Sequence, residues 1–337
     1  MRMTKEQPRL PVDKRADSSR GYVSVGYPSP GSLTAGQPLD ARVDACRCGS
    51  AGHSKNGRHR PAATGALGAQ RVGQARKKII LFVMLLALTA SAQNPPPQAR
   101  GYTLVGSTNF NPLSLSPDNE GNYIWYNPGG ASFMSTTPAP AENILASDPG
   151  LTLDWTQGQT NPWTSISTAA EDAAYYRAWR HGYFEVRMAW DPAVGAWPAI
   201  WMRPIQYTEN PGIEAGELDI YEGQGATPNI FYGTIHDWSA SGVDTNNGND
   251  NSYILPSYID VTNYHTYGVL WVPGQVTWYF DNREVLSAAT YPIFDEQDYF
   301  LILGMQEGAN GSYGNMQGVT ASTMSMNVQW VHVFQNL

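Results

Sequence analysis

The sequence predicts an all-β domain in which two antiparallel sheets pack face to face, as a sandwich or jelly roll. From Gly101 onward, short runs of β-branched and aromatic residues alternate with turn formers such as NPGG, SDPG and VPGQ. Helical periodicity is limited to STAAEDAAYYRAW, residues 167–179, where tyrosine and tryptophan interrupt it. Both cysteines precede residue 93, so the remaining chain cannot use disulfides and has to be held by one large hydrophobic core.

The expected strands are short and rich in residues that favour extended backbone. TWYFDNREVLS, residues 277–287, is expected to be a hairpin with Asp281 and Asn282 at its turn. The strands are expected at residues 102–105, 151–155, 182–190, 230–236, 266–272, 275–280, 299–305 and 324–334.

Composition changes sharply near residue 92. Residues 1–92 hold 15 of the 21 lysines and arginines but only 5 of the 29 acidic residues. Residues 76–92 have a basic start, an apolar run and a final Ala-Ser-Ala, which is the layout of a secretory signal peptide. The apolar run is too short for a membrane span, which needs roughly 20 residues. We therefore expect a secreted protein, extracellular or periplasmic, that keeps no membrane attachment after cleavage.

The segment before the signal peptide, residues 1–75, has a composition typical of disorder. It is either a genuine extension or the result of a mis-assigned start, with the true start near Val72; we favour the second reading. Cys46 and Cys48 with two nearby histidines could suggest zinc, but their irregular spacing argues against it. After the signal peptide, residues 93–100 are expected to form a stiff, proline-rich linker and 101–337 the jelly-roll domain.

The stretch GELDIYEG, residues 216–223, holds three carboxylates, Glu217, Asp219 and Glu222. On a regular strand Glu217 and Asp219 share one face, and Glu222 lies on the other. A β-bulge near Ile220 and Tyr221 would bring all three to one side. Because the backbones of the two glutamates would be roughly 13–16 Å apart, the sheet has to be concave there.

Two converging carboxylates suit glycoside hydrolysis, and a separation of about 5–5.5 Å gives a retaining mechanism. A third carboxylate between them can raise the pKa of a neighbour. The alternatives are a solvated acidic face or a calcium site. No lysine or arginine occurs between Arg203 and Arg283 to neutralise such a face. Calcium loops prefer Asp and Asn in irregular backbone.

ELDIYE resembles the E-x-D-x-x-E signature of glycoside hydrolase family 16, the laminarinase-type group. The resemblance implies a concanavalin A-like jelly roll with a concave substrate cleft, in which Glu217 is the nucleophile, Asp219 the assisting acid and Glu222 the acid/base. It extends over nearly all of 101–337 and also rests on residues 181–204, 232–238, 264–285 and 325–334.

Aromatic side chains beside the cluster are candidates for stacking on sugar rings. Trp197 and Trp201 are four residues apart and share a face on a regular strand. The resemblance places His236 in the cleft. The predicted substrate-binding residues are Trp197, Trp201, Tyr232, His236 and Trp238, whereas Trp271, Trp278 and Trp330 are expected in the core.

Two positions depart from the family pattern. Gly212 stands where many laminarinases have a tryptophan, five residues before the first catalytic glutamate. Gln329 stands where the closing strand often carries an aspartate that binds a structural calcium. No cofactor is expected to be required; Gln329 argues against a structural calcium ion, which stays open as an alternative.

We expect a secreted, endo-acting, retaining glycoside hydrolase that cleaves β-1,3- or mixed β-1,3/1,4-glucan. The alternatives are the same fold acting on a β-galactan such as agarose, a transglycosylase, or a non-catalytic glycan-binding lectin. The expected partner is a polysaccharide. The acidic composition of residues 93–337 argues against nucleic acid, and we expect a monomer.

Overall fold

The computed structural model describes residues 96–127, 138–245, 251–308, 319 and 321–337. These residues belong to one compact unit, Met84–Leu337. The predicted leader, the signal peptide and the start of the linker lie outside the described residues. Among the helices that are described, none has the length and apolarity needed to cross a membrane.

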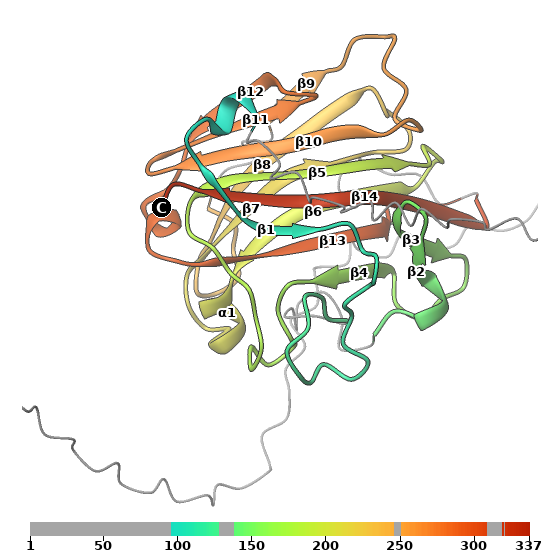
Figure 1. Ribbon diagram of the computed structural model, residues 1–337, viewed down its shortest axis with the longest axis horizontal. Helices are drawn as coiled ribbons and strands as arrows, with labels where there is room; N and C mark the ends of the chain where they lie inside the picture. The colour runs from blue at the N-terminus through green and yellow to red at the C-terminus, as the bar shows by residue number, and fades with distance from the viewer. Residues whose placement is uncertain (1–95, 128–137, 246–250, 309–318, 320) are drawn as a thin grey trace, which may run out of the picture. The chain divides into compact units, whose positions relative to one another are not determined.

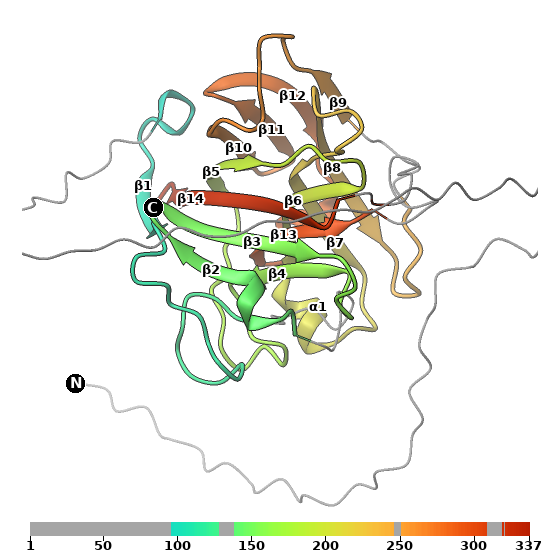
Figure 2. The same cartoon turned by 90° about the vertical axis from the view of Figure 1, so that its right-hand side faces the viewer.

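The domain consists of two antiparallel sheets (Figure 1). An eight-stranded sheet has the order β12-β11-β10-β5-β14-β3-β2, with β1 also pairing β14. A six-stranded sheet has the order β4-β13-β6-β7-β8-β9. In both views β5, β14 and β3 lie side by side (Figures 1 and 2). The two-sheet jelly roll predicted from the sequence is confirmed.

The eight-stranded sheet contains β1 Thr103–Thr108, β2 Ile144–Ser147, β3 Gly150–Thr156, β5 Gly182–Trp190, β10 His265–Val272, β11 Gln275–Phe280, β12 Arg283–Ala289 and β14 Thr323–Gln335. The six-stranded sheet contains β4 Trp163–Ser167, β6 Ala196–Pro204, β7 Ala215–Glu222, β8 Ile230–Trp238, β9 Asn251–Ile254 and β13 Tyr299–Glu307. One α-helix, α1 Ile205–Glu209, and the 3-10 turns Pro97–Ala99, Ala141–Asn143 and Pro292–Asp295 complete the described elements.

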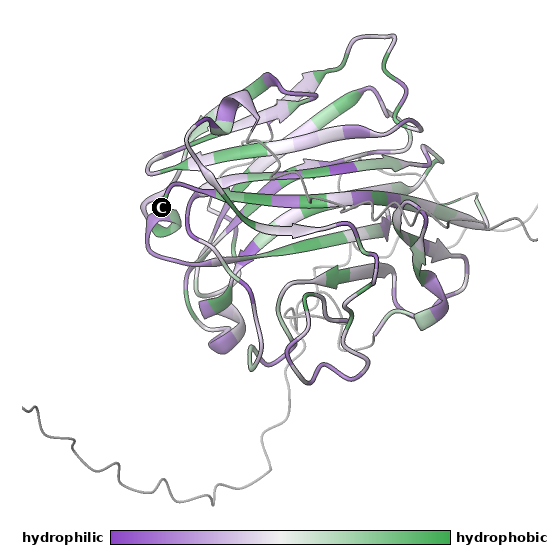
Figure 3. Cartoon of the chain, viewed as in Figure 1, coloured by the Kyte–Doolittle hydropathy of each residue, from purple (hydrophilic) through white to green (hydrophobic). Residues whose placement is uncertain are grey.

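The main core lies between the sheets and receives alternate residues from each strand. Phe184 and Val186 of β5 and Leu218 and Ile220 of β7 belong to the same cluster of fully buried side chains. Hydrophobic and hydrophilic segments alternate along β14 (Figure 3), which agrees with its alternating burial. Burying one large aliphatic side chain contributes roughly 1.5–3 kcal/mol, so this shared core is the main stabilising element of a domain without disulfides.

The start of the described chain packs on the outer face of the eight-stranded sheet. Ala99, within the expected linker, is fully buried in a small cluster with Tyr183 and Phe334. The second half of the 93–100 segment is therefore part of the folded domain.

The predicted hairpin is present, and its turn explains the sequence there. Asp281 and Asn282 both have positive φ, 46° and 63°, as a two-residue hairpin turn between twisted strands requires. Strands β11 and β12 pair on either side of this turn.

The interrupted helical periodicity of one stretch produces no helix, and the expected burial of Trp330 was wrong. In residues 167–179, Ala169 bridges to Tyr176, and the amide of Thr168 donates to the carbonyl of Leu301 on β13. These tertiary contacts outweigh the helical propensity of an alanine-rich stretch. Trp330 is not in the core but half-buried, because β14 has a register shift between Val328 and Trp330 that places the indole against the ring of His332.

Candidate active site

Strand β7 carries the three carboxylates and contains the predicted bulge. Against β6, Ile200 pairs with Tyr221 and Trp201 pairs with Asp219, so Ile220 is an extra residue. Ile220 and Tyr221 are both fully buried in the core. The extra residue restores the parity of the strand and brings Glu222 to the face that carries Asp219.

A tryptophan from the opposite sheet supports the bulge. The indole Nε1–H of Trp278 on β11 donates to the backbone carbonyl of Asp219 at 2.8 Å, within the core. A bulge disrupts the ladder hydrogen bonds, and this donor satisfies a carbonyl at that point. Gly233 on β8 leaves room for the indole, because a Cβ there would lie 2.6 Å from Nε1.

Glu217 receives two donors on a single oxygen. Arg203 Nη1 lies 2.8 Å from Oε2, and the indole Nε1 of Trp238 donates to the same oxygen at 2.9 Å. The Arg203 side chain is only 5% exposed and that of Glu217 16%, so solvent screens this ion pair weakly. Oε2 is held on two sides, and in the described part of the chain no hydrogen bond to Oε1 is observed.

Glu222 has a different environment. Its residue exposure is 8%, and Trp197 Nε1 donates to Oε1 at 2.9 Å. Burial, and then the charge of Asp219, raise the pKa of Glu222 well above its usual range. Glu222 is therefore held as a neutral acid, whereas Glu217 is paired with a cation.

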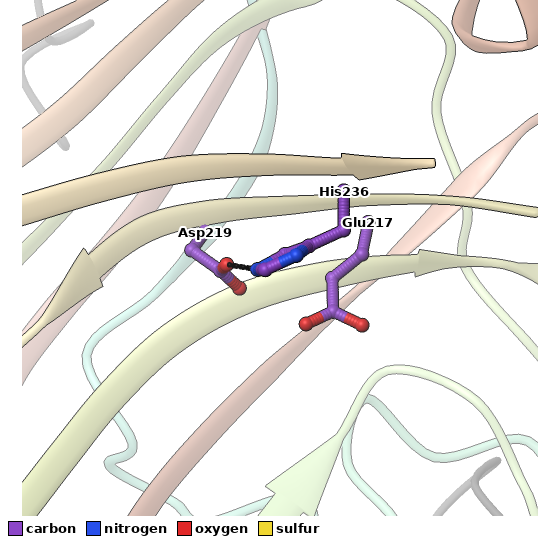
Figure 4. A group of neighbouring side chains, drawn as sticks. All are labelled: Glu217, Asp219 and His236. Carbon is purple, nitrogen blue, oxygen red and sulfur yellow. Dashed lines mark ion pairs between the residues drawn. The ribbon is translucent and has the colours of Figure 1, made fainter. Parts of the chain in front are cut away.

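Asp219 lies between these groups and faces His236 on β8 (Figure 4). The His236 Nε2 lies 3.1 Å from Asp219 Oδ2, in an ion pair that is not an aligned hydrogen bond. Burial and the charge of Glu217 raise the pKa of Asp219 to about 6. The other ring nitrogen, Nδ1, lies 2.7 Å from Oδ2 of Asp244.

Among the described residues, Glu217, Asp219 and His236 offer ligand atoms within 4.8 Å of one another, close enough for a metal ion. Both ring nitrogens already face carboxylates, and the Arg203 guanidinium lies against Glu217. A metal cation would have to displace the ring proton on Nε2 and stand close to that guanidinium. The observed contacts form an ion-pair network of two cationic side chains and several carboxyl groups.

The predicted aromatic residues lie on the same face, in different settings. Trp197 and Trp238 are half-buried, and their indoles hydrogen-bond the two glutamates. Tyr232 is half-buried and pairs with Glu222 across the β7–β8 ladder. Trp201 is 7% exposed and packs in a cluster with Phe300, so packing accounts for most of its surface.

Sequence reasoning missed three residues of this network, Arg203, Asp244 and Trp278 as a hydrogen-bond donor. A signal existed for Arg203, because it lies two residues after Trp201 and therefore on the same face of the strand. No local pattern indicates the role of Asp244, which follows the end of β8, or the contact that Trp278 makes across the core.

A jelly roll with paired carboxylates on one outer face, one ion-paired and one kept neutral, defines the class of jelly-roll glycoside hydrolases. The model of glycosyl hydrolases family 16 matches residues 143–300, which include all three carboxylates. Over these residues the chain is similar to this family.

Named relatives and solved structures agree with this assignment. A beta-glucanase of Rhodothermus marinus is 26% identical over 77% of this chain and 94% of its own length. An endo-1,3-1,4-beta-glycanase of Rhizobium meliloti (strain 1021) is 28% identical over 50% of this chain, a match that spans only 31% of that protein. The laminarinase catalytic domain of Thermotoga maritima MSB8 has the same fold, with a TM-score of 0.56 at 20% identity over 71% of this chain and 100% of that chain.

Proposed function

We propose that the chain is a secreted, endo-acting, retaining glycoside hydrolase of β-1,3- or mixed β-1,3/1,4-glucan. The observation that carries the proposal is the contrast between the two glutamates. Glu217 is paired with Arg203 through one oxygen, whereas Glu222 is buried and has a raised pKa. This division is what a nucleophile and an acid/base require.

In the first step, Oε1 of Glu217 attacks the anomeric carbon while the glycosidic C–O bond breaks. Glu222 gives its proton to the leaving oxygen. In the second step, Glu222, now a carboxylate, takes a proton from water, the water oxygen bonds to the anomeric carbon, and Glu217 leaves. Asp219 holds the proton of Glu222 in place through its charge, which raises the pKa of Glu222.

The residues around the carboxylates suit sugar binding on this face. Trp197, Tyr232 and Trp238 are half-buried and lie beside the glutamates. We propose that these rings and His236 contact the substrate, with Trp201 supporting them from below. No metal ion is needed in this mechanism. At the position of the family's calcium aspartate, Gln329 Oε1 instead accepts a hydrogen bond from Arg187 Nε at 2.7 Å, and a guanidinium repels a cation.

The names of the relatives support a β-glucan substrate, and one of them favours a second candidate. A keratan-sulfate endo-1,4-beta-galactosidase of Sphingobacterium multivorum is 29% identical over 46% of this chain and 37% of its own length. We therefore keep a β-galactan as the alternative substrate. Secretion is supported by the signal-peptide pattern of residues 76–92.

The test is release of reducing sugar from laminarin, lichenan, agarose and carrageenan by the wild type, Glu217→Gln and Glu222→Gln. We expect activity on laminarin or lichenan. We also expect a loss of at least about a thousandfold in either glutamate variant. Asp219→Asn should lose less, because Asp219 acts through its neighbours. Wild-type turnover in either glutamate variant would contradict the catalytic roles of the two glutamates. Activity on agarose alone would show that the substrate is a β-galactan and not a β-glucan.

A further inference from the structure

The ring of His236 makes a shorter contact with Asp244 than with Asp219 of the carboxylate cluster. Its Nδ1 lies 2.7 Å from Asp244 Oδ2 in a well-aligned hydrogen bond. The contact of Nε2 with Asp219 is longer, 3.1 Å, and poorly aligned. The ring also stacks on Trp238, with centroids 5.5 Å apart and an angle of 26° between the planes. The position of the ring beside Asp219 is therefore set mainly by Asp244 and Trp238.

The neighbours of the ring favour its doubly protonated form. An ionised carboxylate only accepts hydrogen bonds, so a carboxylate facing each ring nitrogen favours a proton on both. The charged and titratable groups around the ring are Glu217, Asp219 and Glu222 on β7, Arg203 on β6 and Asp244. Burial lowers the pKa of His236, but the contact with Asp219 and the nearby carboxylates more than offset this and raise it to about 11.

Hydrogen bonds fix the turn that places Asp244 beside the ring of His236. After β8 the chain reverses, with the amide of Gly242 donating to the carbonyl of Ser239, and Asp244 bridges back to Trp238. The hydroxyl of Thr245 then donates to Oδ2 of Asp237 at 2.8 Å. The carboxylate of Asp244 is therefore held at the ring edge opposite Asp219, and its side chain is only 24% exposed.

We propose that Asp244 is a positioning residue for hydrolysis: it orients the ring of His236 toward Asp219 and adds to the carboxylates that favour the charged ring. Its hydrogen bond to Nδ1 makes Asp244 act through the histidine. The cation balances part of the negative charge of the three carboxylates. Without it, Asp219 and Glu222 would bind their protons more tightly. This inference rests on the proposed function only where it predicts an effect of Asp244 on hydrolysis.

Two substitutions of Asp244 distinguish the effect of its charge from the effect of its size. Asp244→Asn keeps an acceptor of nearly the same size at Nδ1 but removes the charge, and Asp244→Glu restores the charge. The matched control is Asp237→Asn, which removes the charge of an acid on β8 and keeps an amide oxygen that can accept the hydrogen bond from Thr245. Melting temperatures of all variants confirm that each is folded.

We expect Asp244→Asn to lower kcat by roughly 10–100-fold, the range known for loss of a carboxylate behind a metal-bound histidine, with little change in KM. The alkaline limb of its pH–rate profile should move to higher pH, because the positive charge of His236 that lowers the pKa of Glu222 is weakened or displaced. Asp244→Glu should recover part of the rate, and Asp237→Asn should keep the wild-type profile. A kcat for Asp244→Asn within twofold of the wild type would overturn the proposal.

A second measurement does not depend on activity. NMR of ¹⁵N-histidine-labelled protein, with His236 assigned from a His236→Gln variant, follows the ring between about pH 5 and pH 10. The wild-type ring should remain doubly protonated, and the Asp244→Asn ring should lose a proton at a lower pH. Identical titration in both proteins refutes the role of Asp244. If the wild type hydrolyses none of the four polysaccharides, the proposed function fails while this measurement still decides the state of the ring.

Discussion

Replacing Trp278 with phenylalanine tests whether the opposite sheet holds the bulge that aligns the carboxylates. The change keeps an aromatic ring in the core but removes the Nε1–H that donates to the carbonyl of Asp219. Leaving that buried carbonyl unsatisfied costs about 1–3 kcal/mol. The smaller ring loses a further 1–2 kcal/mol or so of packing, by comparison with other partial truncations of buried side chains.

Trp271 on the neighbouring strand β10 provides a matched control. It is also fully buried, and within the described part of the chain its indole nitrogen has no hydrogen-bond partner. Trp271→Phe should therefore lose only the packing contribution. Since each kcal/mol lowers the melting temperature of a domain of this size by about 2–4 °C, Trp278→Phe should melt about 2–12 °C below Trp271→Phe.

Calorimetry of the two variants and the wild type gives the comparison, and kcat on the best substrate gives the functional consequence. Trp278→Phe should lose activity because the backbone of Asp219 is no longer fixed, and Trp271→Phe should keep it. Equal melting temperatures and equal kcat values in the two variants would show that the indole hydrogen bond does not hold the bulge.

Three further outcomes are expected. The product formed first should have the anomeric configuration of the cleaved bond, followed by NMR; inversion would mean that the two glutamates are too far apart for a covalent intermediate. Glu222→Gln should match the wild type in melting temperature near pH 4 and exceed it near pH 8. A carboxyl whose folded-state pKa is raised stabilises the fold below its unfolded pKa and loses that contribution as pH rises through the folded one. A difference that does not change with pH would argue against a buried neutral Glu222. N-terminal sequencing of exported protein should begin at or near Gln93, after Ala-Ser-Ala, and an intact leader on the active exported form would contradict cleavage there.

Alternation of side chains was sufficient to predict most of the strands and the bulge. The argument for the bulge used only parity: Glu217 and Asp219 share a face, and Glu222 joins them only if one residue is added. The structure places that residue at Ile220. This succeeded because both facts, the odd spacing and the buried residues between the acids, are local.

Contacts between distant segments could not be predicted in the same way. The donor for the Asp219 carbonyl is 59 residues further along the chain, and its partner Gly233 appears in the sequence as an ordinary strand glycine. Asp244 lies in a turn rich in small polar residues, where an aspartate is unremarkable. The stretch 167–179 failed as a helix for a related reason, since its bonds to β13 depend on how the sheets are assembled.

Glu217 and Glu222 are an odd number of residues apart, so the positions of the two carboxyl groups depend on the number of residues in strand β7. Deleting Ile220 would restore strict alternation, make Tyr221 the residue directly after Asp219 in the sequence, and leave four steps between the glutamates. The carboxyl groups would then still share a face without any bulge. The carbonyl of Asp219 could return to the ladder, and the indole of Trp278 would lose its acceptor inside the core. Natural length variation is therefore expected in the loops around β7 but not within it, where a single inserted or deleted residue changes both sheets at once.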